Sequence, residues 1–237
     1  GVAERADLPE PRYLGPPPAR RLLAVSAQHY SFVVEAFVRM VKASEAAEYA
    51  FTLRETRTAD IIEDVRTLRS ELGVLYRSDF NRKVIDKLLR DSELVFTPLF
   101  LASPHIFVAR TNPLASRRQV TLEDLEGLPR LTFDQGTDNS FYFAEEILST
   151  RSAAQDIRVS DRATIFNLMI GLDGYTISTG IVSDDLDPSI VAVPLEVDER
   201  IEIGWIGHAS APLTGQAERF VAEMREVVSS FGVEPLS

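Results

Sequence analysis

Short apolar runs alternate with amphipathic stretches along most of the chain. The apolar run at residues 22–25 is typical of a buried strand. From Ser31 onward apolar residues recur every three or four positions, which predicts a helix. Its expected inner face consists of Phe32, Val33, Val34, Phe37, Val38 and Val41.

The same alternation of strand-like and helix-like patterns continues to the end of the chain. Further strands are predicted at 49–53, 72–75, 94–100, 105–109, 131–133, 157–159, 175–178, 190–195 and 201–206. Further helices are predicted at 59–69, 81–90, 141–148, 163–172 and 214–230, with a short one capped by Thr121 and Asp124. Asp161 is placed to cap the helix at 163–172, with Ile165, Phe166, Met169 and Ile170 facing inward.

Alternating β and α units predict parallel sheets covered by helices. Because there are more strands than one small sheet holds, we expect an α/β fold of two Rossmann-like lobes. The late strand near Trp205 would return the closing helix to the first lobe. We expect a proline-rich linker at 1–20, lobe I at 21–108 plus 206–237, and lobe II at 109–205.

Composition narrows the function classes. The 237 residues include no Cys, which excludes disulfides, Cys-based zinc sites, iron–sulfur clusters and thiol catalysis. The three His residues lack metal-ligand spacing, so no metal or cofactor is expected. The acidic group Asp184, Asp185 and Asp187 is interpreted as a solvated turn, because it lacks calcium-loop spacing. A net charge of −11 argues against a nucleic-acid surface on these residues.

The N-terminal sequence and the length of the apolar runs show whether a signal peptide or a membrane helix is expected. No apolar run reaches the roughly 20 residues of a membrane helix, so no membrane partner is expected. The N-terminus lacks the apolar core of a signal peptide. Because the chain begins with Gly, we expect a processed or truncated chain with a further segment upstream.

Candidate chemistry lies in four strand-to-helix loops, 26–31, 55–58, 135–140 and 160–162, which are rich in hydroxyl and amide groups. In open α/β sheets, ligands bind beyond the carboxyl ends of strands, where helix N-termini favour anions. We therefore expect a small anionic, carboxylate or amino-acid-like ligand. Helix capping alone explains the same residue types equally well.

Three side chains in these loops have both a functional and an ordinary explanation. Arg57 and Arg162 would bind a ligand carboxylate as planar forks, or would pair with nearby acids. His29 would donate to a ligand, or would simply pack beside Tyr30. Catalytic motifs are missing and the lysines lie on surface-type helices, so we expect a binding domain with no catalytic residues.

Three stretches resemble the effector-binding domain of LysR-type transcriptional regulators. They are LLAVSAQHYSFVVEAFVRMV at 22–41, NPLASRRQVTLEDLEGLPRLTF at 112–133 and SDRATIFNLMIGLDGYTIST at 160–179, and the order of elements agrees over 21–231. The resemblance implies a fold like the type 2 periplasmic binding proteins, with a ligand cleft between lobes joined by crossover strands.

The loops that the resemblance assigns to the cleft coincide with those chosen from strand ends. Together they place the ligand site at Ser26, Gln28, His29, Tyr30, Ser31, Thr56, Arg57, Tyr76, Gln135, Gly136, Thr137, Asn139, Ser140, Arg162, Ser178, Thr179 and Gly180. We expect Ser26→Ala and Thr137→Ala each to weaken ligand binding. Two features depart from the family pattern: Asp173 precedes Gly174 at a turn, and residues 79–93 form a longer helical insertion.

The resemblance also implies partners. We expect a cytoplasmic homodimer built from residues 32–41 and 49–53 against the other lobe of the partner. DNA would be contacted only through an N-terminal helix-turn-helix that is absent here. A type 2 solute-binding protein of a transporter, or an enzyme on the same fold, remains an alternative.

Overall fold

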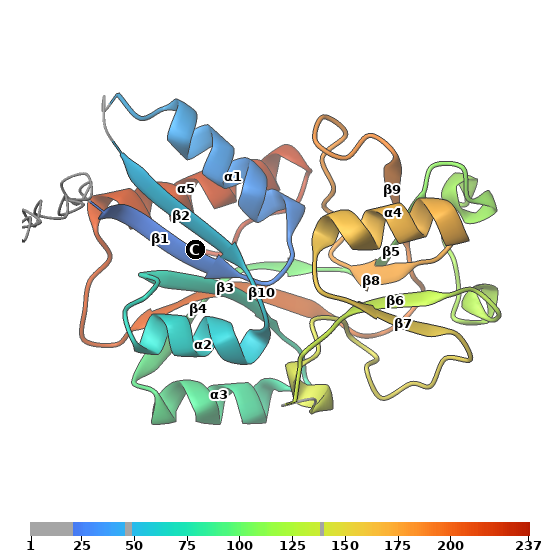
Figure 1. Cartoon of the computed structure of the whole chain (residues 1–237), viewed down its shortest axis with the longest axis horizontal. Helices are drawn as coiled ribbons and strands as arrows, with labels where there is room; N and C mark the ends of the chain where they lie inside the picture. Colours follow the sequence, from blue (N-terminus) through green and yellow to red (C-terminus); the bar gives the residue numbers. More distant parts are fainter. Residues whose placement is uncertain (1–20, 46–48, 138–139) are drawn as a thin grey trace, which may run out of the picture.

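The chain folds into two α/β lobes that lie side by side (Figure 1). This computed structural model describes residues 21–45, 49–137 and 140–237. The predicted linker at 1–20 lies outside the described residues. None of the helices in the described part of the chain is long and apolar enough to span a membrane.

Lobe I contains a mixed five-stranded sheet with helices on both faces (Figure 1). Its strand order is β2 (Ala50–Glu55), β1 (Arg21–Ala27), β3 (Leu72–Arg77), β10 (Ile201–His208) and β4 (Leu94–Ala102). The first three strands are parallel, and β10 is antiparallel to both of its neighbours. One face carries α1 (Ser31–Lys42) and α5 (Gly215–Ser230), and the other carries α2 (Thr58–Arg66) and α3 (Arg82–Asp91).

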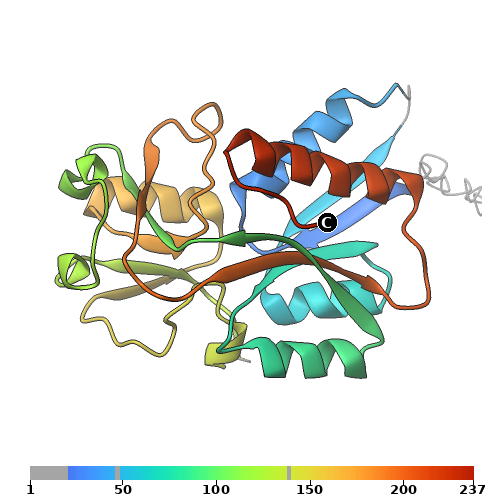
Figure 2. The same ribbon diagram turned by 180° about the vertical axis from the view of Figure 1, so that it is seen from behind.

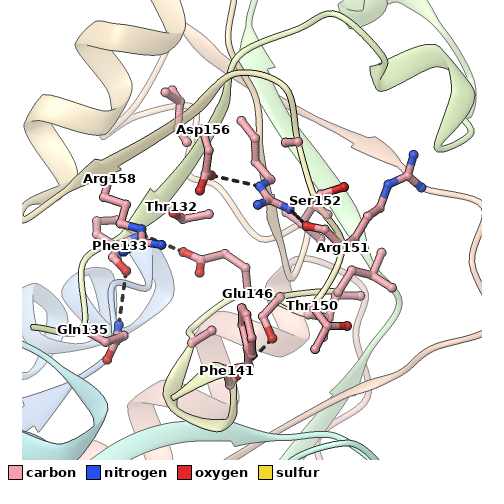
Figure 3. Close-up of a pocket in the computed structure, with 18 of the residues that line it drawn as sticks. Thr132, Phe133, Gln135, Phe141, Glu146, Thr150, Arg151, Ser152, Asp156 and Arg158 are labelled. Carbon is pink, nitrogen blue, oxygen red and sulfur yellow. Dashed lines mark hydrogen bonds and ion pairs between the residues drawn. The ribbon is translucent and has the colours of Figure 1, made fainter. Parts of the chain in front are cut away.

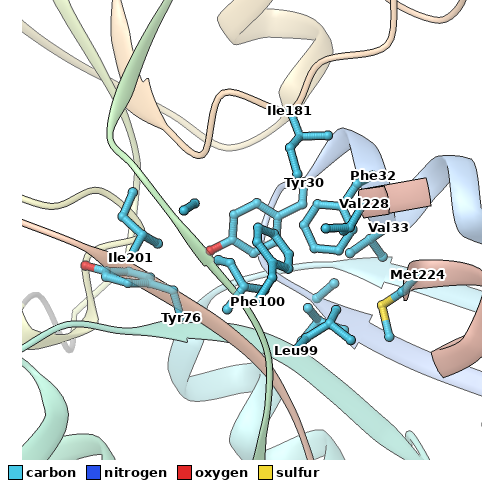
Figure 4. Packing of buried hydrophobic residues seen from close by; sticks show 14 of the residues in the cluster. Tyr30, Phe32, Val33, Tyr76, Leu99, Phe100, Ile181, Ile201, Met224 and Val228 are labelled. Atoms are coloured by element: carbon cyan, nitrogen blue, oxygen red, sulfur yellow. The ribbon is translucent and has the colours of Figure 1, made fainter. Parts of the chain in front are cut away.

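The two faces of this sheet bury separate apolar clusters because side chains alternate along each strand. On β3, Val74 and Tyr76 join the cluster beneath α1 and α5, whereas Leu75 joins the cluster beneath α2 and α3. Figure 4 shows the larger cluster, in which Phe32 of α1 and Met224 of α5 lie close to β4. Helices therefore pack against both faces of the sheet, and the loops at its strand ends are anchored to this packed core.

Lobe II is smaller and combines antiparallel and parallel pairing. Its three-stranded antiparallel sheet has the order β8 (Thr176–Ser178), β5 (His105–Ala109) and β9 (Ile190–Pro194). Next to it, β6 (Arg130–Phe133) pairs in parallel with β7 (Asp156–Val159). The lobe also contains α4 (Arg162–Leu172) and three 3₁₀ turns, η1 (Pro113–Ser116), η2 (Glu123–Leu125) and η3 (Phe141–Phe143).

Two segments cross between the lobes, one from β4 to β5 and one from β9 to β10 (Figure 2). The whole of β10 pairs with lobe I strands, so the second crossing precedes Ile201 and the expected boundary at 206 falls inside a strand. The first crossing lies at 103–104, because β5 already pairs within lobe II. Continuous strand pairing explains why both expected boundaries are a few residues late.

Several sequence predictions need correction. The helix predicted at 141–148 is only the turn η3, after which the chain is irregular. The sheets were predicted to be parallel, but the lobe I sheet is mixed and the three-stranded sheet of lobe II is antiparallel, because β10 and β5 arrive from the opposite lobe. On α4, Ile170 is 47% exposed instead of buried. On α1, Val38 is 36% exposed, because Ala36 and Met40 take the buried positions.

Candidate functional site

The predicted loops of lobe I meet lobe II across an interlobe cleft. In lobe I the cleft is formed by the carboxyl ends of β1 and β2 and the first residues of α1 and α2. In lobe II it is formed by the end of β6, the irregular segment at 140–146, the start of α4 and the end of β8. Polar side chains from both lobes bond one another across this cleft. We call these contacts the interlobe seam; they join His29, Thr58 and Ser31 of lobe I to Glu145, Gln135 and Arg162 of lobe II.

The seam begins with His29 of lobe I and Glu145 of lobe II. The Glu145 carboxylate accepts a hydrogen bond from the backbone N–H of His29 at 2.8 Å. Its two oxygens also lie 3.0 and 2.9 Å from His29 Nδ1. Gln135 Nε2 donates to the same carboxylate at 3.3 Å. A carboxylate from lobe II therefore occupies the donor groups just before α1.

His29 is held in place from a second direction. Its ring stacks on Phe133 at the end of β6, with centroids 3.8 Å apart and planes 5° apart. Burial by itself lowers the pKa of His29, but the hydrogen bond and charge of Glu145, followed by the charge of Glu55, reverse this, so the pKa is raised. Contact with Glu145 therefore favours the protonated form of His29 more than burial alone would allow.

Gln28 connects three elements of lobe I through its side-chain amide. Its Nε2 donates to Thr58 Oγ1 at 2.8 Å, and its Oε1 accepts from the Tyr30 hydroxyl and the Tyr76 N–H. Thr58 then reaches lobe II: its N–H donates to Gln135 Oε1 at 3.0 Å, and its hydroxyl donates to the Phe143 carbonyl at 2.7 Å. The start of α2 is thus bonded directly across the cleft.

Arg162, the first residue of α4, reaches from lobe II to lobe I. Its guanidinium donates to Ser31 Oγ at 3.2 Å and lies 3.6 Å from Asp187. Arg162 Nε lies 3.2 Å from Glu55 Oε1, but the two atoms are not aligned as a hydrogen bond. Both atoms are buried and lack an aligned partner among the described residues. Unsatisfied buried groups of this kind offer hydrogen bonds to an incoming ligand.

The outer edge of the seam is more exposed. Arg57 of lobe I pairs with Asp134 of lobe II at 2.9 Å, and both side chains are partly in solvent. Gly136 has a φ of +72°, and a Cβ there would lie 2.6 Å from the Arg57 guanidinium. The left-handed backbone conformation favours glycine here, whereas the half-exposed Arg57 side chain can move aside.

Acids outnumber cations in the cleft. Glu55, Glu145 and Asp187 face Arg162 and His29. Burial raises the pKa of Glu55, although the charge of Arg162 acts against it. Burial, followed by the charge of Glu145, raises the pKa of Glu146 to about 8, against the N–H of Phe133 and the charge of Arg130. A further anion would therefore need to replace a carboxylate already present.

The cleft is closed. The space remaining between His29, Phe133, Arg162 and their neighbours is about 30 Å³. A single water occupies a comparable volume in the liquid. A small molecule can enter only if the seam opens.

The structure brings together most of the predicted site residues. Gln28, His29, Tyr30, Ser31, Tyr76, Gln135, Arg162 and Ser178 lie at the cleft or in its bonding network. Thr56, Arg57, Gly136 and the exposed Thr137 lie towards its outer edge. Asn139 lies outside the described residues.

Four predicted residues make their contacts elsewhere. Ser26 is buried inside lobe I, where its hydroxyl bonds Asp64 and Ser70. Ser140 accepts from the Tyr142 N–H in η3, and Thr179 accepts from the Ile181 N–H. Gly180 packs against the His105 ring. The reasoning behind Ser26→Ala is therefore wrong, since this side chain stabilises lobe I instead of facing the cleft.

Sequence reasoning missed Glu145, Glu146 and Phe133. The two glutamates fell in a predicted helix, where acids ordinarily face solvent. Asp187 was interpreted as part of a solvated turn, yet it accepts from Ser31 Oγ at 3.1 Å. Its neighbour Asp184 does remain on the surface, paired with Arg110. Nothing in the acidic pattern alone separates these two aspartates.

Comparisons with known proteins agree with this architecture. A family model described as the LysR substrate binding domain matches residues 43–229. No curated protein sequence matches the chain.

Solved structures show the same fold at low identity. The regulatory domain of MetR, a LysR family regulator from N. meningitidis, is 14% identical with a TM-score of 0.60, over 91% of this chain and 98% of that one. Oxidised OxyR is 17% identical with a TM-score of 0.57, over 88% and 96%. The effector binding domain of QuiR in complex with shikimate is 13% identical with a TM-score of 0.56, over 88% and 97%.

Proposed function

The chain belongs to the family of LysR substrate-binding domains, and from that premise we propose that its interlobe cleft senses a small carboxylic acid. The effector would bind between the lobes and change their arrangement. In the intact regulator a separate DNA-binding domain would receive that change. Family membership favours this role over that of a transporter's solute-binding protein.

One observation carries the proposal: the contacts across the cleft are polar and directional. His29, Thr58 and Ser31 of lobe I bond Glu145, Gln135 and Arg162 of lobe II. Each such bond exchanges with water or with a ligand at little net cost, unlike an apolar interface. A seam of this kind supports two lobe arrangements that differ by only a few kcal/mol, which a ligand can bias.

The Glu145 carboxylate, which bonds the N–H and ring nitrogen of His29, supports the proposal that the effector is a carboxylate. Glu145 is bonded there as a free carboxylate would be, by the backbone N–H and by Nδ1. An effector acid that displaces Glu145 leaves the net charge of the cleft unchanged. It would also offer an acceptor to Arg162 Nε, which has no aligned partner among the described residues. We therefore infer that Glu145 is an internal competitor of the effector.

The test is the affinity for a carboxylic acid effector in three forms of the protein. A thermal-shift screen of small monocarboxylates and dicarboxylates identifies a binder, since a ligand at 100 times its Kd adds about 2.7 kcal/mol of stability. Calorimetry then compares the wild type with Glu145→Gln and His29→Ala. We expect Glu145→Gln to tighten binding about threefold or more, because the competitor loses its charge, and His29→Ala to weaken it about tenfold.

Other outcomes would contradict the proposal. Weaker acid binding by Glu145→Gln would make that carboxylate a contact for the effector instead of its competitor. Sustained chemical turnover of the bound acid would replace sensing with catalysis. Arg158→Gln, which removes a cation outside the cleft, is the matched control and should leave the affinity unchanged.

We propose further that the domain acts as a cytoplasmic homodimer. Apolar side chains are exposed on the outer face of α1 and just before β2, with Val38 36% and Tyr49 47% exposed. On lobe II, Ile170 and Leu172 of α4 are each 47% exposed. A two-fold pair would bury the first patch of each copy against the second patch of the other.

A further inference from the structure

Lobe II contains a cavity of about 320 Å³ that is separate from the space between the lobes (Figure 3). It lies between strands β6 and β7 and the irregular segment at 140–153. The side chains of Phe133, Glu146 and Ile177 form the wall that it shares with the cleft. Its volume is at the lower end of the range of small-molecule sites.

A buried carboxylate faces this cavity. Glu146 is 6% exposed and lines the wall (Figure 3). Its Oε1 accepts one hydrogen bond, from the Phe133 N–H at 2.9 Å. No cation among the residues described lies within ion-pair distance of it. The carboxyl group therefore retains acceptor positions that a ligand in the cavity can use.

The rest of the lining divides into apolar walls and a charged rim. Phe133, Phe141, Ile147 and Leu148 contribute apolar surface. At the rim, the Arg130 guanidinium is already bonded to Asp156 and to the Arg151 carbonyl. The side chains of Arg151 and Arg158 are exposed, so water screens their charges. Asp156 therefore compensates part of the Arg130 charge, and the remainder favours the ionised form of Glu146.

We propose that this lobe II cavity binds a small organic ammonium ion, with its apolar body against the aromatic and aliphatic walls and its ammonium group on Glu146. An ammonium supplies the donors that the carboxylate lacks, and it compensates the charge when Glu146 ionises. This second site goes beyond the carboxylate effector of the cleft. It would couple to the cleft through Glu145, the next residue in the chain, which bonds His29.

Protonation gives the site a distinctive signature. Burial and then the charge of Glu145 raise the pKa of Glu146, so at neutral pH the empty site holds a proton. An ammonium ion would drive ionisation, and a proton would leave to the buffer. The titratable and charged groups that face Glu146 are Glu145, Arg130, Arg151, Asp156, Arg158, Tyr30 and Tyr76.

The experiment is a calorimetric titration with 2-phenylethylamine, compared with 3-phenylpropanoate, which has a similar body but no amine. We expect the amine to bind and to release protons at pH 7, measured from the difference between two buffers of different ionisation enthalpy. Glu146→Gln should weaken amine binding about tenfold and abolish proton release. Ala144→Leu, which narrows the cavity and keeps Glu146, should also weaken it.

Glu226→Gln is the matched control, because it makes the same chemical change at an exposed position of α5 in lobe I, away from both the cavity and the cleft. Amine affinity should stay within about twofold of the wild type in this variant. The proposal fails if the amine does not bind, if Glu146→Gln binds it equally well, or if Glu226→Gln weakens binding as much as Glu146→Gln does. The affinity of Glu145→Gln for an acid tests the cleft proposal, and the affinity of Glu146→Gln for the amine tests the cavity proposal. Each proposal can therefore fail without the other.

Discussion

At the scale of single residues, Glu145 and Glu146 illustrate how environment decides the role of a side chain. They are adjacent and chemically identical, yet Glu145 bonds His29 in the cleft and Glu146 is buried without a cation among the described residues. Against the effect of burial, Glu145 raises the pKa of His29. Burial raises the pKa of Glu146 itself to about 8, so Glu146 is favoured as a neutral acid at neutral pH.

We expect the free energy of unfolding to fall as the pH rises from about 5 to about 8. The pKa of Glu146 is about 8 in the folded protein and 4.5 as its ordinary value, so in this range the folded state holds a proton that the unfolded state has lost. The raised pKa of His29 acts in the same direction, because its stabilisation is lost as the pH passes that value. Chemical denaturation at several pH values measures this slope.

Glu146→Gln isolates the contribution of one group. Because Gln does not titrate, the variant should lose less stability than the wild type over the same pH range. The lowered pKa values of Asp124 and Asp161 do not interfere, since their contributions are lost only at more acidic pH. Parallel curves for the two proteins would show that Glu146 already ionises normally in the fold.

At the scale of elements, the position of α2 decides whether the start of that helix can reach lobe II. Gly73 of β3 lets α2 approach the sheet, because a Cβ there would lie 2.6 Å from Ile61 Cγ2 and 3.1 Å from Val65 Cγ2. Ile61 and Val65 are fully buried. The same helix begins at Thr58, whose N–H bonds Gln135. The packing of α2 against β3 therefore positions the N-terminus of α2, where Thr58 bonds Gln135 of lobe II.

Gly73→Ala should destabilise the protein by about 1–3 kcal/mol through overpacking beneath α2. The matched control is Gly171→Ala, at an exposed helical position of α4 where a Cβ meets nothing within 4 Å. There the same substitution should stabilise by up to about 1 kcal/mol, because Ala is the better helix former. Urea denaturation measures both changes, and equal effects would refute the packing argument.

At the scale of the whole molecule, the apolar patches on opposite lobes decide how copies associate. Phe37 and Phe51 lie edge to face beneath the outer surface of α1 and β2, with Tyr49 stacked at a tilt on Phe51. This face lies at the β2 edge of the lobe I sheet, away from the cleft. A dimer built there would leave both ligand sites open and would transmit lobe movements to its partner.

We expect sedimentation velocity to find a dimer for the wild type and a monomer for Val38→Glu, because a buried carboxylate in an apolar interface is costly. Circular dichroism should be unchanged in the variant. Val95→Glu, on β4 at the opposite edge of the same sheet, is the control, since Val95 is 50% exposed and should stay outside the interface. A dimer that survives Val38→Glu would place the interface elsewhere.

The sequence by itself determined the element order apart from the helix predicted at 141–148, because the patterns that predict each element are local. Thr121 and Asp124 bond reciprocally as predicted, and Asp161 accepts from the Thr164 N–H at the start of α4. The family was also identifiable from three stretches, and the loops at strand ends bond one another across the cleft, as Thr58 does with Gln135 and Ser31 with Arg162.

Only the tertiary structure decided which side chains meet in those loops and what state they adopt. Local pattern predicted a helix through Glu145 and Glu146, but bonds to His29 and Phe133 hold these carboxylates inward and leave a single turn of η3. Ser26 has the residue type of a ligand contact, yet Asp64 lies within bonding distance inside lobe I. Burial and charge at long sequence separation set these outcomes, and no local periodicity encodes them.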